Sequence, residues 1–365
     1  MNIAINRLFS LVGFDKPKPK PVKKARILFI LKERNEYGYS YTGMSSGLYN
    51  SAKFCSDMLD AHGYTCKLVE VIDNNSIDKE VTGFNPDIVI IEALWVVPSK
   101  FAVLNALHPN VIWIVRVHSE AAFLAQEGIA IEWISQYPRY KNVYVSMNSQ
   151  EGFTQAKDFY TDKLVDLNKL LYLPTYYPAP NQPYFNPTKP KNNLSVACMG
   201  AIRPLKNNLI QAVAAMRFAD SRNMILNFHI NNSRLESGGN PCYKNILNLF
   251  AGTKHNLVQH AWMDHPTFLQ FLSYMDIGMQ VSFSETFCII AADIVAAGVP
   301  IAGSPAIRWL DEDSQSDTIT VEKIVSTLNQ IYHNNGLIKD NLKRLQKYSK
   351  EAQAAWLAEL KYLKF

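Results

Sequence analysis

The sequence predicts an α/β protein in which two Rossmann-like domains face each other across a cleft. Short apolar runs alternate with helical patterns in both halves of the chain, which indicates two parallel sheets covered by helices. A proline-rich segment separates the halves, and 365 residues are enough for two domains of about 150 to 200 residues each. Ligands of such proteins bind at the carboxyl ends of the strands, so functional residues are expected in the cleft.

The N-terminal half, predicted as one domain over residues 25–173, contains short apolar runs that are each bounded by polar residues. This pattern is typical of strands that are buried on both faces of a parallel sheet. A helical pattern runs from Met44 to His62, and another begins after Pro98. The predicted strands are 25–31, 65–71, 87–94, 110–117, 142–147 and 170–173.

Residues 174–193 contain six prolines and no helical period, so they are predicted as an interdomain linker. A second α/β series is predicted as a domain over 194–335, followed by C-terminal helices over 336–365 that cross back to the N-terminal domain. In that tail an apolar residue recurs every four positions, as on one face of a helix, at Tyr348, Ala352, Trp356 and Leu360. The predicted strands are 194–200, 224–230, 256–262, 275–282 and 299–303, and the predicted helices end near Ala219, cover 241–250 and 266–274, and begin at 286 and at Val321.

The composition excludes several classes of protein. Apolar residues make up 48% and charged residues 19%, which excludes disorder over most of the chain. No apolar run reaches the roughly 18 residues that a membrane-spanning helix needs. The five cysteines are widely spaced and form no Cys-x-x-Cys pair, so neither a disulfide framework nor a structural zinc site is expected, and the sequence predicts a cytoplasmic protein.

Residues 1–24, predicted as a separate leader, carry all of the excess positive charge. They contain six basic residues and one acid, a balance equal to the net charge of +5 of the whole chain. The remainder is charge-neutral, which argues against a protein that coats nucleic acid. An apolar stretch precedes the basic one, the reverse of a secretory signal. Three interpretations stay open: an arm packed on the folded body, weak contact with an anionic membrane, and an arm that binds phosphates.

Two carboxylates in segment 282–305 are spaced as one face of a helix would space them. Glu285 follows a predicted strand, and Asp293 comes eight residues later, slightly more than two helical turns. In a cleft, the pair could accept hydrogen bonds from two hydroxyl-bearing parts of one ligand, such as a sugar and a ribose. The alternative is an acid favoured at a helix start by the helix dipole, together with an unrelated surface aspartate.

A second segment, 198–216, combines a glycine with two cations. Its strand ends at Gly200, and Arg203 and Lys206 follow in the loop that opens a helix. A diphosphate needs cationic donors and free backbone N–H groups, and a helix N-terminus beside arginine and lysine supplies both. Solvated charges in an ordinary loop are the alternative.

These two segments together resemble the C-terminal donor domain of GT-B glycosyltransferases, in particular the retaining enzymes of family 4. The resemblance rests on the glycine-ended strand followed by Arg203 and Lys206. It also rests on a later Glu-x7-Glu segment with a Gly-x-Pro turn, in which Glu285, Gly298 and Pro300 fall in register. The chain departs from this pattern at Asp293, which replaces the second glutamate.

The resemblance implies transfer of a sugar from a nucleoside-diphosphate sugar, with a UDP-sugar as the expected co-substrate and neither another cofactor nor a metal. It implies that the anomeric configuration is retained. The two cations would neutralise the leaving diphosphate, Glu285 would hold sugar hydroxyls and Asp293 the ribose. The implied donor-binding residues are Gly200, Arg203, Lys206, Glu285, Thr286, Phe287 and Asp293.

Segments 47–54, 90–101 and 113–130 are similar to glycosyltransferase-like proteins encoded by tailed bacteriophages. This favours a hydroxymethylated base in phage DNA as the acceptor, which the enzyme would flip into its cleft. A surface glycan or lipid fits the apolar and basic leader equally well. A GT-B protein that binds a nucleotide sugar without transferring it, and an epimerase, are the further alternatives.

Residues of the N-terminal half are expected to complete the site. The resemblance places His118, which follows a predicted strand, beside the transferred sugar as a catalytic residue with Arg203, Lys206 and Glu285. A lone histidine after a strand is otherwise more often structural. The loop after the first strand and the end of the third strand are expected on the acceptor side, with the candidates Tyr41, Gly43, Gly47 and Glu92, whereas Trp95 is interpreted as core.

Other motifs carry less weight. The acidic triplet Asp311–Asp313 matches a metal-binding pattern of another glycosyltransferase fold, but its position in a polar loop favours a solvated turn. The glycine fingerprint of dinucleotide-binding proteins is absent from the sequence, which argues against NAD as a cofactor.

Overall fold

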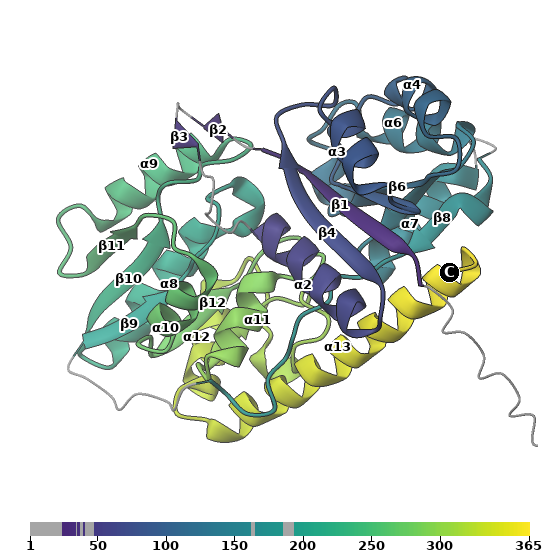
Figure 1. Ribbon diagram of the computed structural model, residues 1–365. Coiled ribbons are helices and arrows are strands. Elements are labelled where there is room, and N and C mark those ends of the chain that lie inside the picture. The colour runs from purple at the N-terminus through teal and green to yellow at the C-terminus, as the bar shows by residue number, and fades with distance from the viewer. Residues whose placement is uncertain (1–23, 34, 37–38, 41–46, 162–164, 185–192) are drawn as a thin grey trace, which may run out of the picture.

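The computed structural model describes residues 24–33, 35–36, 39–40, 47–161, 165–184 and 193–365. Two parallel sheets, each covered by helices, lie beside each other (Figure 1). We call β1–β8 with α2–α7 the N-terminal lobe, and β9–β13 with α8–α12 the C-terminal lobe. The predicted fold class is confirmed.

The main sheet of the N-terminal lobe has six parallel strands in the order β4-β1-β5-β6-β7-β8. Its strands are buried apolar runs, as in the centre of β1. A separate antiparallel pair is formed by β2 (Asn35–Glu36) and β3 (Tyr39–Ser40). The six strands are β1 (Arg26–Lys32), β4 (Thr65–Val71), β5 (Ile88–Glu92), β6 (Ile112–Val117), β7 (Val143–Met147) and β8 (Leu170–Tyr172).

Helices cover both faces of this sheet because alternate residues of each strand point to opposite sides. Ile27 and Phe29 of β1 pack with α2 (Gly47–Ala61) in one core cluster. Leu28 and Ile30 belong to the cluster on the other face. The helices that contribute to this second cluster are α3 (Ile77–Phe84), α4 (Lys100–Leu107), α5 (Ala121–Leu124), α6 (Ala130–Gln136) and α7 (Gln150–Thr161), with 3-10 turns at η1 (Tyr137–Arg139) and η2 (Leu167–Lys169) nearby.

The C-terminal lobe has five parallel strands in the order β11-β10-β9-β12-β13. They are β9 (Asn193–Ala197), β10 (Ile225–Asn231), β11 (Asn256–His260), β12 (Ile277–Gln280) and β13 (Ile301–Gly303). One face packs on α8 (Asn208–Ser221), α9 (Gly239–Phe250) and α12 (Val321–Ile331), and the other on α10 (His265–Leu272) and α11 (Ile289–Ala296). Two 3-10 turns, η3 (Pro204–Lys206) and η4 (Glu312–Ser314), complete the lobe.

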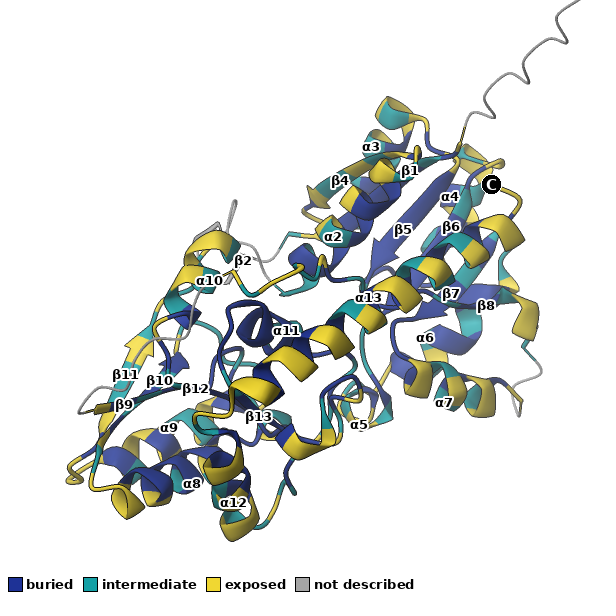
Figure 2. Ribbon diagram, turned by 90° about the horizontal axis from the view of Figure 1, so that it is seen from below, coloured by how far each residue is buried: buried dark blue, intermediate teal, exposed yellow. Residues whose placement is uncertain are grey.

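The long helix α13 (Asn335–Tyr362) crosses from the C-terminal lobe to the N-terminal lobe, as the sequence predicts (Figure 1). Leu345 packs in a core cluster of the C-terminal lobe, whereas Trp356 and Leu360 pack in the cluster that contains β1. Trp356 Nε1 also donates a hydrogen bond to the Pro174 carbonyl at 2.7 Å. One side of α13 is buried and the other is exposed (Figure 2), which explains the apolar residue at every fourth position.

Several boundaries differ from the sequence prediction. The helix predicted from residue 286 begins at Ile289, because Cys288 adopts a left-handed conformation with φ of 61° and separates residues 283–287 from the helix. The helix predicted from Met44 corresponds to α2, and residues 44–46 lie outside the described residues. The leader at residues 1–23 also lies outside them. Within the described part of the chain, no helix is both long and apolar enough to cross a membrane.

Candidate active site

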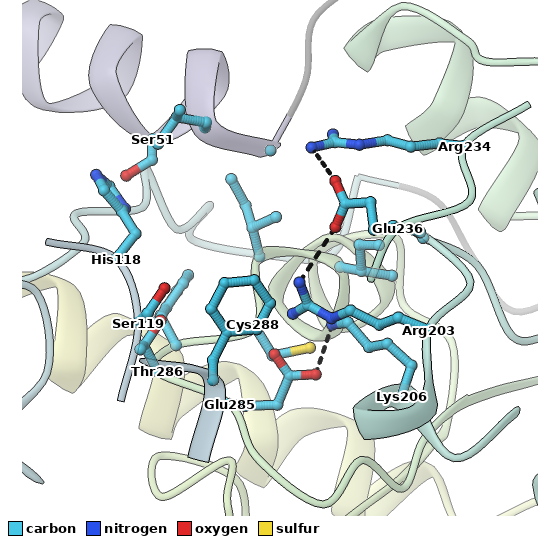
Figure 3. Close-up of a pocket in the computed structure, with 18 of the residues that line it drawn as sticks. Ser51, His118, Ser119, Arg203, Lys206, Arg234, Glu236, Glu285, Thr286 and Cys288 are labelled. Atoms are coloured by element: carbon cyan, nitrogen blue, oxygen red, sulfur yellow. Dashed lines mark hydrogen bonds and ion pairs between the residues drawn. The ribbon is translucent and has the colours of Figure 1, made fainter. Parts of the chain in front are cut away.

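A cavity of about 640 Å³ lies between the two lobes, at the carboxyl ends of strands from both sheets. Parallel sheets place their ligand sites at this edge. Of the residues predicted for the site, His118, Gly47 and Glu92 border the cavity from the N-terminal lobe. The predicted residues that border it from the C-terminal lobe are Gly200, Arg203, Lys206, Glu285, Thr286, Phe287 and Asp293. Figure 3 shows four of them, Arg203, Lys206, Glu285 and Thr286. Tyr41 and Gly43 lie outside the described residues.

The central polar contact of the C-terminal wall joins Lys206 and Glu285. Lys206 Nζ donates a hydrogen bond to Glu285 Oε1 at 2.6 Å, and the two side chains are only 13% and 6% exposed. Burial lowers the pKa of Lys206, but the Glu285 carboxylate outweighs it and holds that pKa above its ordinary value. The ammonium group is therefore charged at neutral pH.

A second cluster of charged side chains, Arg203, Arg234 and Glu236, lies on the same wall of the cavity. Glu236 lies between two arginines: Arg203 Nη1 is 3.2 Å from its Oε2, and Arg234 forms an ion pair with its Oε1 (Figure 3). The Arg203 guanidinium also lies over the Phe123 ring of the N-terminal lobe, 4.6 Å from the ring centroid. Arg203 is thus held by residues of both lobes.

Local backbone geometry sets the position of these cations. Gly200 follows β9 with φ of 111°, a backbone conformation that favours glycine, and a Cβ atom there would also lie 2.7 Å from Ile290 Cδ1 of α11. Asn207 has φ of 55° and precedes α8. Its Nδ2 donates to the carbonyls of Val281 and Thr318 at 3.1 and 2.7 Å, which anchors the loop that carries Lys206.

The proposed shared helix face of Glu285 and Asp293 is wrong. Glu285 lies in the loop before α11, whereas Asp293 lies inside that helix. Two contacts of Phe287 hold the loop before α11 in place. Trp309 Nε1 donates a hydrogen bond to the Phe287 carbonyl at 2.8 Å, and the Phe287 ring stacks on Tyr348 with centroids 4.9 Å apart. Both acids nevertheless border one cavity.

Asp293 is buried and already bound by two side chains. Tyr177 Oη donates to its Oδ1 at 2.8 Å, and His265 Nε2 is 2.7 Å from the same oxygen. Burial lowers the pKa of His265, but the hydrogen bond and charge of Asp293 outweigh this effect and raise it overall.

The N-terminal wall carries His118 at the carboxyl end of β6. Its Nε2 forms a hydrogen bond with the Glu92 carboxylate, and Asn148 Nδ2 lies 3.3 Å from its Nδ1. Glu92 is fully buried beside Arg116, so the acceptor-side role predicted for Glu92 cannot involve an exposed carboxylate. Asn148 Nδ2 is also 3.2 Å from Thr286 Oγ1, and this contact links the two lobes beside the cavity.

Sequence reasoning missed several residues of the cleft. Arg234 and Glu236 follow β10, and the rule that loops after parallel strands meet at one edge could have found them. Asn148 follows β7 in the same way. Trp95 is half-buried and borders the cavity while packing against the core, so the interpretation of Trp95 as core alone is incomplete. Asp311 caps η4 by accepting from the Asp313 amide at 3.0 Å, as expected of a polar turn.

Comparisons with known proteins agree with this architecture. No protein-family model matches the sequence, and no curated protein sequence matches it significantly. Sucrose-phosphate synthase from Thermosynechococcus elongatus has a similar structure, with a TM-score of 0.66 and 11% identity over 93% of this chain and 99% of that one. Trehalose 6-phosphate synthase from Burkholderia multivorans has a TM-score of 0.66 and 10% identity over 93% and 97% of the two chains.

A third similar structure is an α-glucosyltransferase in complex with UDP and a 13-mer DNA that contains a HMU base. It superimposes with a TM-score of 0.62 and 11% identity, over 91% of this chain and 100% of that one. At such low identity, the likeness concerns the arrangement of the two sheets and the cleft between them. The chain therefore has the two-lobed α/β fold of the GT-B glycosyltransferases.

Proposed function

We propose that this protein is a glycosyltransferase that moves a sugar from a nucleoside-diphosphate sugar, in the first instance a UDP-sugar, to an acceptor hydroxyl. The observation that carries the proposal is the cavity between the lobes, where Arg203 and Lys206 lie on one wall and His118 on the other. The cations match the charge of a diphosphate, and the carboxylates and imidazole match the hydroxyls of a sugar.

Catalysis would consist largely of stabilising the leaving diphosphate. The bond between the sugar C1 and the phosphate oxygen breaks, and its electron pair stays on that oxygen. Arg203 and Lys206 would stabilise the charge that develops there, together with backbone N–H groups at the start of α11, where Ile289 and Ile290 border the cavity. The helix that the sequence predicts for this role, α8, begins at Asn208 and does not border the cavity. Removing one such donor from an enzyme site typically costs about 100- to 1,000-fold in turnover.

The donor would lie along the C-terminal wall. Glu285 and Thr286 would hold hydroxyls of the sugar, opposite His118. Asp293 would accept a hydrogen bond from the ribose through Oδ2, since Tyr177 and His265 both use Oδ1. Gly200 and the backbone of Phe287 would let the diphosphate approach the chain closely.

We propose that the anomeric configuration is retained, following the resemblance to family 4. The acceptor oxygen would bond to C1 on the face that the diphosphate leaves, and the acceptor proton would pass to the departing phosphate oxygen. This route needs no carboxylate nucleophile. NMR of the product, which distinguishes α- from β-linked sugars, tests it directly.

For the acceptor, we propose a hydroxymethylated base in DNA. One observation favours it: this chain shares its fold with a glucosyltransferase whose structure contains HMU-containing DNA. The resemblance of residues 47–54, 90–101 and 113–130 to phage proteins stays a prediction, because no curated sequence matches this chain. Gly47, at the start of α2, borders the cavity, and a Cβ atom at this position would lie only 3.3 Å from Ile289 Cγ2. The base would have to leave the duplex to reach C1 in the cleft.

The experiment combines a radiolabelled UDP-sugar panel with three acceptors: hydroxymethylated DNA, the same DNA without hydroxymethyl groups, and a membrane extract. Label retained only on hydroxymethylated DNA supports the full proposal. Label in the membrane fraction would instead identify a glycan or lipid acceptor. Release of the sugar without any acceptor still identifies an enzyme, whereas UDP binding without turnover would identify a binding protein and contradict the proposal.

A further inference from the structure

The Glu92 carboxylate lies between a fixed cation and the imidazole of the candidate sugar site. Glu92 ends β5 and is in register with Arg116 on the neighbouring β6. Arg116 Nη1 is 3.2 Å from both carboxylate oxygens, and His118 Nε2 is bonded to Oε2. Glu92 and Arg116 are fully buried, whereas His118 keeps 16% of its side chain exposed. The glutamate therefore acts on the cleft through the histidine.

The Arg116 guanidinium is held in one position by several acceptors. Its Nε donates to the Leu173 carbonyl at 3.0 Å, and its Nη2 donates to the Pro174 carbonyl at 3.1 Å. Its Nη1 lies 3.4 Å from Ser51 Oγ in addition to the glutamate. A guanidinium stays charged in proteins, so a permanent positive charge lies behind the wall of the sugar site.

The other titratable groups that face Arg116 are neutral at physiological pH. Burial raises the pKa of the Cys55 thiol to about 11. Burial also raises the pKa of Tyr348, which faces the guanidinium, and of Tyr176, which lies beside Cys55. Among these groups, the carboxylate of Glu92 is the one that counters the arginine charge.

This arrangement fixes the protonation of His118. A carboxylate only accepts hydrogen bonds, so His118 Nε2 carries the hydrogen and Nδ1 carries the lone pair. Asn148 Nδ2 lies 3.3 Å from Nδ1 but also 3.2 Å from the hydroxyl oxygens of Thr175 and Thr286, so both of its hydrogens keep acceptors when a ligand hydroxyl takes the Nδ1 lone pair. Burial lowers the pKa of His118, and Arg116 adds to this effect, so that the pKa lies below its ordinary value despite Glu92. The imidazole is therefore neutral, with its acceptor edge on the side of the ring away from Glu92.

We infer that Glu92 is a positioning residue that presents His118 to the sugar as a neutral hydrogen-bond acceptor, so that this subsite selects a hydroxyl-bearing neutral sugar over a sugar acid. The inference rests on the proposed function. A hydroxyl can donate to Nδ1, whereas a carboxylate has no hydrogen to donate and would leave its own charge and the Nδ1 lone pair without a partner. Without Glu92, the charge of Arg116 would instead attract a carboxylate.

The test is the ratio of kcat/KM for UDP-glucose to kcat/KM for UDP-glucuronate, because a ratio does not depend on the fraction of folded protein. The wild type should prefer UDP-glucose by at least about 100-fold. Glu92→Gln keeps the size of the side chain but no longer neutralises the charge of Arg116, so the ratio should fall by about tenfold or more. His118→Gln leaves the Glu92–Arg116 pair intact and should lower the ratio as well.

Glu359→Gln is the matched control. Glu359 lies on α13, accepts a hydrogen bond from the Tyr172 amide at 3.0 Å, and does not border the cavity. It should leave the ratio unchanged. NMR of ¹⁵N-labelled histidine gives an independent readout: His118 should carry its hydrogen on Nε2 in the wild type and titrate at lower pH in Glu92→Gln. A wild-type ratio near one, or an unchanged ratio in Glu92→Gln, would overturn the inference while UDP-glucose turnover still upheld the proposed function. A wild type that binds no UDP would overturn the proposed function itself.

Discussion

Lys206 Nζ lies 2.6 Å from Glu285 Oε1, so the cation assigned to the diphosphate and the carboxylate assigned to the sugar hydroxyls are paired with each other. Both side chains are almost buried. When one partner of a buried pair is removed, the other is left with an uncompensated charge. Variants of the two residues should therefore have different consequences for binding and for transfer.

Lys206→Ala should reduce turnover of the UDP-sugar by about 100- to 1,000-fold, because the leaving diphosphate loses a charged donor. Affinity for UDP should fall as well, since UDP carries the same diphosphate. Single-turnover kinetics and calorimetric titration with UDP measure the two effects. Circular dichroism should show an unchanged fold.

Lys323→Ala is the control for this variant. Lys323 is 68% exposed and its Nζ is 3.8 Å from Asp317, a contact typical of weak surface pairs. It should alter neither turnover nor UDP affinity. Near-normal turnover in Lys206→Ala would contradict the assignment of the diphosphate site.

Glu285→Gln should separate binding from transfer. The amide keeps the shape of the side chain but no longer neutralises Lys206, so UDP should bind at least as tightly as to the wild type. Transfer should fall by about 100-fold, because the glutamine holds the sugar hydroxyls more weakly in the transition state. Glu322→Gln, which changes an acid that is 72% exposed, should change neither quantity. Weaker UDP binding together with normal transfer would refute the assignment of Glu285 to the sugar.

Trp356→Ala should destabilise the protein by about 3 to 5 kcal/mol. The indole is fully buried between α13 and the sheet of the N-terminal lobe, and its loss leaves a cavity and removes the hydrogen bond to Pro174. Denaturant unfolding measures the change. Tyr362→Ala, which truncates a side chain that is 55% exposed on the same helix, should have an effect several times smaller. Equal effects would mean that α13 does not depend on Trp356 for its attachment to the first sheet.

The fold was predictable because its strands carry a strong local signal. Residues 27–31 are all apolar and form the centre of β1 at Arg26–Lys32, and the four-residue spacing around Trp356 predicts the buried side of α13. The start of α11 was not predictable in this way. It depends on the left-handed conformation of Cys288, which no propensity rule assigns to a cysteine. The proposed boundaries of the two domains stay predictions.

The site was predictable in outline, because strand ends of parallel sheets converge on one edge. His118, Arg203, Lys206 and Glu285 indeed border one cavity. The partners of these residues were not predictable. The position of Glu236 between Arg203 and Arg234, and of Asn148 between His118 and Thr286, depends on how loops from different strands fold over one another.

His265 and Asp293 should make stability depend on pH in a defined direction. In the folded protein, burial lowers the pKa of His265, but the hydrogen bond and the charge of Asp293 outweigh burial, so the pKa is raised overall. A group whose pKa is raised on folding stabilises the protein fully below its unfolded pKa, and this contribution disappears as the pH rises through the folded pKa. The stabilisation by His265 should therefore be larger on the acidic side of the ordinary histidine pKa of about 6.5.

The measurement compares the free energy of unfolding of the wild type and His265→Gln at about pH 5.5 and about pH 8.5, on either side of the ordinary histidine pKa. The difference between the two proteins should be larger at the lower pH, because only the charged imidazole gains from the Asp293 carboxylate. His62→Gln serves as the control, since His62 Nδ1 contacts the Met58 carbonyl at 2.8 Å rather than a carboxylate. A difference that grows toward alkaline pH would show that the imidazole is bound in its neutral form and would contradict the prediction.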